Sequence, residues 1–109
     1  MSSDMSSAKL IVAYPPPMDV AAFEKVYMEE HVPLAIAKLA GKTKIVATKI
    51  IASPQGKPQF CRVAEVHLPS LKVLEECFGG GKETLANAVK ISSGGPPVIM
   101  IALEDSFTF

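Results

Sequence analysis

Residues 19–39, DVAAFEKVYMEEHVPLAIAKL, form the stretch around which the rest of the chain is organised. A helix that advances by about 100° per residue gathers six of these residues on one stripe, namely Val20, Phe23, Tyr27, Glu30, His31 and Leu34. Pro33 has no N–H to donate and disfavours helical geometry at Val32, which predicts a kink or break immediately after His31. We therefore expect an imidazole at the edge of a buried face, beside loosened backbone.

The segments on either side of this helix predict four strands and a second helical region. The strands are expected at residues 8–14 (AKLIVAY), 43–52 (TKIVATKIIA), 59–68 (QFCRVAEVHL) and 97–105 (PVIMIALED). Ser70 is placed to cap the second helical region, which the glycines at 79–81 interrupt. The order β, α, β, β, α, β predicts an α+β fold of the ferredoxin-like type, with a four-stranded antiparallel sheet and helices on one face.

The strands carry apolar residues on both of their faces. In the strand at 59–68, alternation places Phe60, Arg62, Ala64, Val66 and Leu68 on one side and Cys61, Val63, Glu65 and His67 on the other. A sheet of this kind needs a cover on each face, and the helices supply only one. The simplest second cover is the sheet of another copy, so the sequence predicts a homodimer.

Composition narrows the class of protein. The chain has 109 residues, 49% of them hydrophobic, with eleven basic and eleven acidic residues, which predicts one domain at 8–109 after a disordered tail at 1–7. Lys and Arg form no run interleaved with aromatics, so a nucleic-acid partner is not expected. The N-terminus has no basic region and only a short apolar run, which favours a cytoplasmic protein without a membrane partner. Two cysteines without CxxC spacing favour reduced thiols.

His31 is the leading candidate for chemistry, because an imidazole titrates near physiological pH and acts as acid, base or ligand. The alternative is a partly buried histidine bonded to a carbonyl that the break sets free. Glu30 is either its proton-accepting partner or a surface carboxylate, and Tyr27, one turn earlier, either bonds a ligand or packs. Tyr14, at the end of the first strand, is placed to line a pocket mouth.

Other polar positions carry weaker signals. Glu65 and His67 share one strand face, where they contact either a ligand or the second subunit. No metal site is predicted, because no local spacing such as HExxH is present. The segment GGGKETL lacks the Walker spacing and is interpreted as a helix break rather than a phosphate loop.

Taken together, the YP at the end of the first strand, FEKVYMEEHVPLAIAKL and the terminal PVIMIALED resemble the EthD family of the dimeric α+β barrel superfamily. The resemblance covers residues 8–107, and its most specific positions are Phe23, Tyr27, His31, Pro33 and Leu34. It implies two subunits that pair their sheets around a barrel, each with a small cavity between sheet and helices. Family members often have a second histidine at the position of Glu30, so a mechanism based on paired histidines is not transferred.

The resemblance also implies a role in the metabolism or catabolism of small ether, aromatic or polyketide-type molecules. If the chain is an enzyme, the expected type is a cofactor-free isomerase, decarboxylase or monooxygenase with His31, Tyr27 and Glu30 as catalytic residues. A small apolar or phenolic ligand is then expected to contact Tyr14, Phe23, Leu34, Glu65 and His67. Two alternatives are a non-catalytic carrier that serves a partner oxygenase, and a haem-handling barrel with His31 as axial ligand.

Overall fold

The computed structural model describes residues 7–109, and the tail expected at 1–7 lies outside this range except for Ser7. The elements are β1 (Ala8–Tyr14), α1 (Val20–Val26), the π-helical segment η2 (Tyr27–His31), α2 (Val32–Lys38), β2 (Lys44–Lys49), β3 (Arg62–Leu68), α3 (Leu71–Gly80), α4 (Lys82–Ile91) and β4 (Val98–Leu103). The predicted ferredoxin-like order is confirmed, although β2, β3 and β4 are shorter than the apolar runs that predict them.

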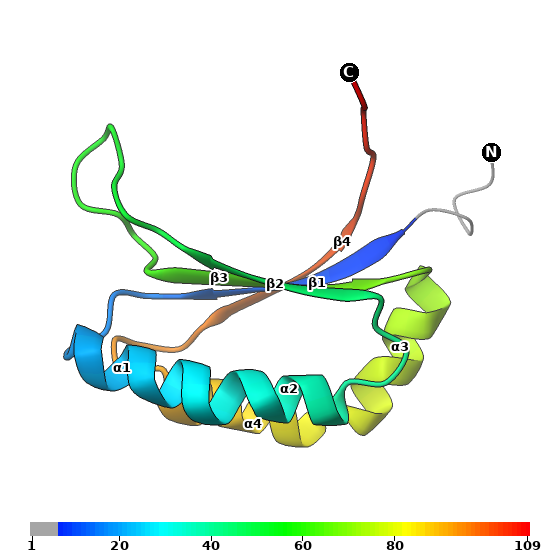
Figure 1. Cartoon of the computed structure of the whole chain (residues 1–109), viewed down its shortest axis with the longest axis horizontal. Coiled ribbons are helices and arrows are strands. Elements are labelled where there is room, and N and C mark those ends of the chain that lie inside the picture. The colour runs from blue at the N-terminus through cyan, green and yellow to red at the C-terminus, as the bar shows by residue number, and fades with distance from the viewer. Residues whose placement is uncertain (1–6) are drawn as a thin grey trace.

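The strands form one antiparallel sheet in the order β2-β3-β1-β4, and the helices cover a single face of it (Figure 1). The predicted alternation of β3 is confirmed, with Ala64, Val66 and Leu68 buried in the core. Val12 pairs with Ala64 on one side and with Ile99 on the other, so these three residues share the helix-covered face. The core therefore fills the layer between this face and the helices.

Of the kink or break predicted immediately after His31, the break is wrong, because the helix continues through Pro33. Val32 keeps helical angles, and its N–H bonds to the carbonyl of Tyr27, five residues earlier. A proline ring clashes with the carbonyl four residues before it, and the wider π-helical turn accommodates that conflict without ending the helix.

The same π-helical turn changes which side chains point inward. The buried residues recur every four positions, at Phe23, Tyr27, His31, Ala35 and Leu39. Four residues of an α-helix overshoot a full turn, and the wide turn compensates part of this drift. Contrary to the predicted stripe, Val20 and Glu30 are exposed and Leu34 is only half-buried.

The ends of the helices follow the predicted signals. The Asp19 carboxylate accepts the N–H of Ala22 at 3.1 Å, and the Ser70 hydroxyl accepts that of Val73 at 3.2 Å. The predicted interruption lies at Gly81, where α3 has ended and α4 is about to begin. Cys61 and Cys77 are both free thiols, as predicted.

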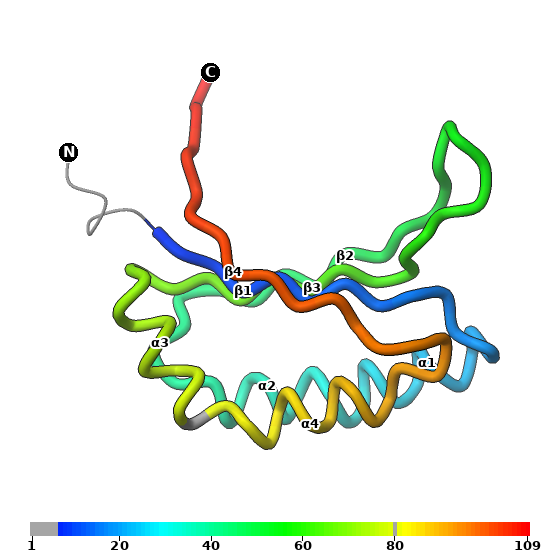
Figure 2. Tube along the Cα trace, turned by 180° about the vertical axis from the view of Figure 1, so that it is seen from behind, coloured from blue at the N-terminus to red at the C-terminus, as the bar shows by residue number. Residues whose placement is uncertain are grey.

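The face of the sheet opposite the helices carries no layer of described residues. The β2–β3 connection and the segment after β4 both project away from the sheet on this side (Figure 2). Ile51 in the former is 89% exposed and Phe107 in the latter 79%. Within residues 7–109, none of the helices is long and apolar enough to cross a bilayer.

We predict that Gly94→Ala lowers the free energy of unfolding by about 2 kcal/mol, because the added Cβ overpacks a closed contact. A Cβ built at Gly94 lies 1.8 Å from the carbonyl oxygen of Pro16, in the turn that leads from β1 to α1. Gly79→Ala is the matched control, since nothing lies within 4 Å of its Cβ, and it should leave stability unchanged or raise it by up to ~1 kcal/mol. Urea denaturation measures both, and equal effects would contradict the prediction.

Candidate functional site

A small cavity lies between the covered face of the sheet and the helices, and His31 forms part of its wall. It offers about 30 Å³ in which the centre of a water-sized molecule fits. The sheet contributes Leu10, Val12, Ile45, Ala64 and Val66, the long helix Tyr27, His31, Val32, Ala35 and Leu39, and α4 Thr84, Leu85 and Ala88. The lining is thus apolar except for Tyr27, His31 and Thr84.

Both ring nitrogens of His31 are hydrogen bonded within the chain. Nδ1 lies 2.9 Å from Oδ1 of Asn87, and Nε2 lies 3.1 Å from the Tyr14 hydroxyl. The amide nitrogen of Asn87 donates in turn to the Glu30 carboxylate at 2.9 Å. A carboxylate only accepts, so Glu30 fixes the orientation of the Asn87 amide.

This orientation decides the tautomer of the neutral imidazole. Because Oδ1 of Asn87 accepts, the proton of neutral His31 lies on Nδ1. Nε2 then keeps its lone pair and accepts from the Tyr14 hydroxyl. The exposed carboxylate of Glu30 thus controls, through Asn87, which nitrogen of a buried ring is basic.

Burial sets the protonation states of these groups. Desolvation lowers the pKa of His31, against smaller opposing effects of the Asn87 hydrogen bond and the Glu30 charge. Desolvation also raises the pKa of the Tyr14 phenol far above its ordinary range. At neutral pH the site therefore contains a neutral imidazole beside a neutral phenol.

An aromatic cluster holds the imidazole in place. The rings of Phe23 and Tyr27 stack at 5.6 Å, and that of His31 follows Tyr27 at 5.8 Å along the helix. Tyr14 packs against all three, with centroid distances of 5.5, 5.4 and 6.1 Å. Because three helical turns and one strand all contribute rings, His31 has little freedom to reorient.

A partly buried ion pair between Arg62 and Glu24 lies at the other end of this cluster. The Arg62 guanidinium lies 5.1 Å from the centroid of the Tyr27 ring. Two hydrogen bonds of 2.7 and 3.0 Å join Arg62 to the Glu24 carboxylate, which lowers the pKa of Glu24. Glu24 and Tyr27 lie almost one turn apart, so the pair anchors the helix against β3.

The structure brings four of the predicted site residues together. Tyr27 and His31 line the cavity, while Tyr14 and Phe23 pack behind them. Glu30 lies outside the cavity, yet it reaches His31 through Asn87.

Leu34, Glu65 and His67 do not join the cavity. Leu34 faces an outer groove between α2 and α4. Glu65 and His67 lie on the open face of the sheet, where Lys9 contacts Glu65 at 2.5 Å and His67 lies 3.7 Å from Glu104. The sheet itself separates these two residues from His31.

Sequence reasoning missed Asn87 and Thr84. Both belong to the helix that Leu85 and Ala88 predict, but nothing local shows which of its polar residues faces His31. Their proximity to His31 follows from the packing of α4 against η2, which cannot be predicted from periodicity alone. No group of three or more His, Cys, Asp or Glu able to hold a metal ion occurs among residues 7–109.

No protein-family model matches the chain, and no curated protein does so. Solved structures do match. An EthD family protein from Bacillus halodurans superposes with a TM-score of 0.83 at 29% identity, covering 91% of this chain and 99% of that one. An EthD-like protein from Ralstonia eutropha follows with a TM-score of 0.69 at 16% identity, covering 90% and 91%.

The chain is therefore similar to EthD family proteins, and the predicted resemblance is confirmed. A cofactor-independent oxygenase from Streptomyces nogalater shares the fold, with a TM-score of 0.58 at 10% identity and coverage of 95% and 96%. At this identity the likeness concerns the fold alone. The EthD-like chain thus has a scaffold that also occurs in proteins acting on small molecules.

We predict that His31 makes the stability of the EthD-like chain depend on pH in mildly acidic solution. Its pKa is lower in the folded chain than its ordinary value near 6.5, so the unfolded chain takes up the proton first as the pH falls. The contribution of His31 is complete above about pH 6.5 and is lost as the pH falls through the folded-state pKa.

Urea denaturation between about pH 5 and pH 8 measures this dependence. His31→Gln should flatten the loss of free energy of unfolding below about pH 6.5, while His67→Gln serves as the control and should retain it. The prediction is wrong if the His31 variant keeps the full pH dependence.

Proposed function

We propose that this chain binds a small, neutral, largely apolar molecule in the cavity and that His31 exchanges a proton with it. The observation that carries the proposal is the hydrogen-bonded series Glu30, Asn87, His31, Tyr14, which begins at the surface and ends beside the cavity. The similarity to EthD-like proteins supports a place in small-molecule metabolism.

The lining of the cavity indicates the class of ligand. None of its thirteen residues is Asp, Glu, Lys or Arg, and burial disfavours the charged form of His31. An ionic ligand would lose its hydration without gaining a partner of opposite charge. The ligand is therefore neutral, and either it has few heavy atoms or the lining side chains move to admit it.

The chemistry follows from the tautomer. Nε2 carries the lone pair, so a ligand that displaces the Tyr14 hydroxyl gains access to a base. The displaced hydroxyl then donates to an oxygen of the ligand. Positive charge that develops on the ring is stabilised by Oδ1 of Asn87 and by the nearby Glu30 carboxylate, the two groups that raise the pKa of His31.

Proton transfer is tested with methyl acetoacetate, a small activated carbonyl compound. We expect the chain to accelerate deuterium incorporation at its central carbon in D₂O, measured by NMR. Replacing His31 by Gln should reduce this acceleration about 100-fold, the usual contribution of a positioned base. Leu34→Ala is the control, because Leu34 lies outside the cavity, and its rate should stay within about twofold.

A second candidate function is that of a non-catalytic carrier for a partner oxygenase. The internal pairing of both imidazole nitrogens favours it, since a purely structural histidine would be bonded in the same way. A carrier binds the probe without deuterium exchange, and its binding is insensitive to His31→Gln and to pH. Exchange that depends on His31 contradicts the carrier.

The haem-handling alternative gains no support from this geometry. An axial ligand must offer a free ring nitrogen, and in this structure Nδ1 bonds Asn87 while Nε2 becomes free only when the Tyr14 hydroxyl is displaced.

The proposed assembly is a homodimer that covers the open face of the sheet. Ile11, Val46, Val63 and Met100 contribute apolar side chains to this face, which the helices do not reach. On the edge strand β4, Val98 and Met100 lie on this face and are 42% and 43% exposed. Exposed apolar surface of this extent is typical of an interface between copies.

We predict that Met100→Glu shifts the chain from dimer to monomer, because it places a charge on the apolar face that the second copy covers. Ile36→Glu is the matched control, since Ile36 is an exposed apolar residue of α2 on the helical side. Analytical ultracentrifugation at micromolar concentration measures both variants. A monomeric unmodified chain would overturn the proposed assembly.

A further inference from the structure

Thr84 contributes the one buried side-chain oxygen or nitrogen that has no hydrogen-bond partner among the described residues. The residue is 4% exposed and lines the cavity from α4. A buried hydroxyl without a partner destabilises the fold, and a methyl group of the same shape would avoid that cost. A molecule bound in the cavity can therefore supply the hydrogen-bond partner that the Thr84 hydroxyl lacks within the chain.

The position of Thr84 relative to His31 follows from the direction of the helices. His31 pairs with Asn87, whereas Lys38, later in the long helix, pairs with Glu83, earlier in α4. The two helices thus run antiparallel, as Figure 2 shows. Thr84 precedes Asn87 by three residues, or about 4.5 Å of rise, so its hydroxyl lies beyond His31 in the direction of α3.

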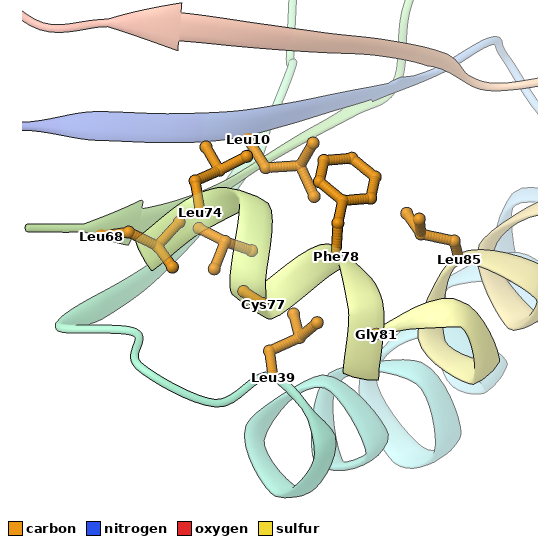
Figure 3. Close-up of a pocket in the computed structure, with 9 residues that line it drawn as sticks. Leu10, Leu39, Leu68, Leu74, Cys77, Phe78, Gly81 and Leu85 are labelled. Atoms are coloured by element: carbon orange, nitrogen blue, oxygen red, sulfur yellow. The ribbon is translucent and has the colours of Figure 1, made fainter. Parts of the chain in front are cut away.

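A second, wholly apolar compartment lies against α3, and Figure 3 shows the side chains that line it. It offers about 10 Å³ and shares four wall residues with the His31 cavity, namely Leu10, Leu39, Val66 and Leu85. Its remaining walls come from Leu68 and from α3 and the residue after it, with Leu74, Cys77, Phe78 and Gly81. The two spaces are therefore adjacent, with these four leucine and valine side chains in the wall of both.

We propose that Thr84 is the ligand-recognising hydroxyl of the cavity and that the ligand is a neutral alcohol or ketone with an apolar tail. The oxygen of the ligand lies between Thr84 and His31, and the tail passes Leu39 and Leu85 into the compartment beneath α3. This inference rests on the cavity of the proposed function, and it names the substrate class.

The geometry assigns each part of the ligand a separate partner. The oxygen satisfies the Thr84 hydroxyl, which is the only buried side-chain oxygen or nitrogen in residues 7–109 left without a hydrogen bond. The tail contacts only apolar side chains, because none of the surface that lines the α3 compartment is polar. A charged head group has no partner, since no ionic side chain lines either space.

The probes are 1-propanol and 1-hexanol. The control is 1-chlorohexane, a molecule of similar size to 1-hexanol that lacks the hydroxyl. Binding is measured by NMR titration. For the unmodified chain we expect affinity to rise roughly fourfold for each added CH₂ while the tail fills the α3 compartment. Thr84→Val should lower affinity for 1-hexanol about tenfold and leave that for 1-chlorohexane unchanged. Thr84→Ser, which keeps the hydroxyl, should retain most of the affinity for 1-hexanol.

Stability provides a second measurement that separates recognition from folding. Removal of an unpaired buried hydroxyl should raise the Tm of Thr84→Val by about 4 °C, although the variant binds alcohol less well. A variant that is more stable and binds less tightly supports the inference. A variant that is less stable, or one that binds 1-hexanol as the unmodified chain does, overturns it.

Cys77→Met tests the direction of the tail. Cys77 lines the α3 compartment and not the His31 cavity, so the longer side chain fills the space assigned to the tail. Affinity for 1-hexanol should fall several-fold while that for 1-propanol is retained, and equal effects on both alcohols would contradict the assignment. Because 1-hexanol has no activated carbon acid, these results are independent of the deuterium exchange that tests His31.

Discussion

The hydrogen bond between His31 and Asn87 is the interaction on which the site depends. It joins the long N-terminal helix to α4, and it connects a surface carboxylate to a buried ring. Without it the imidazole has no fixed tautomer, and the Tyr14 hydroxyl has no defined acceptor. The 2.9 Å contact between His31 Nδ1 and Asn87 Oδ1 thus joins two helices and also leaves Nε2 as the basic nitrogen of the ring.

The two faces of the sheet carry different kinds of side chain. The covered face supplies Leu10, Val12, Ala64 and Val66 to the cavity. The open face carries the ionic cluster of Lys9, Glu65, His67 and Glu104 next to apolar side chains. Alternation along each strand keeps these chemistries apart, so a change on one face need not disturb the other.

Much of this arrangement could be predicted from the sequence. Strand alternation, the caps at Asp19 and Ser70 and the glycine interruption are local signals, and each of them determines the element that it predicts. The burial of His31 and its proximity to Tyr27 also follow from spacing within one helix. These properties depend on neighbours in the chain and are therefore visible in it.

The rest depends on contacts between distant segments. Glu65 and His67 were predicted to contact the ligand, but β3 directs them to the face opposite His31. Asn87 is separated from His31 by 56 residues, so its role appears only once α4 packs against η2. Pro33 is a local signal, but it does not determine whether the helix ends, since a proline can either end a helix or be accommodated by a wider turn.

Because of the π-helical turn at Tyr27–His31, the number of residues in this part of the helix determines which side chains face the site. A π-helical turn is equivalent to an α-helix with one residue inserted. If one residue between Tyr27 and His31 were absent, a regular α-helix could form, and the side chains after it would keep nearly the same orientation toward the aromatic cluster, with their residue numbers shifted by one. Alignments of EthD-like chains should therefore be anchored separately on the two sides of this turn, because a single gap there determines which residue faces Tyr14.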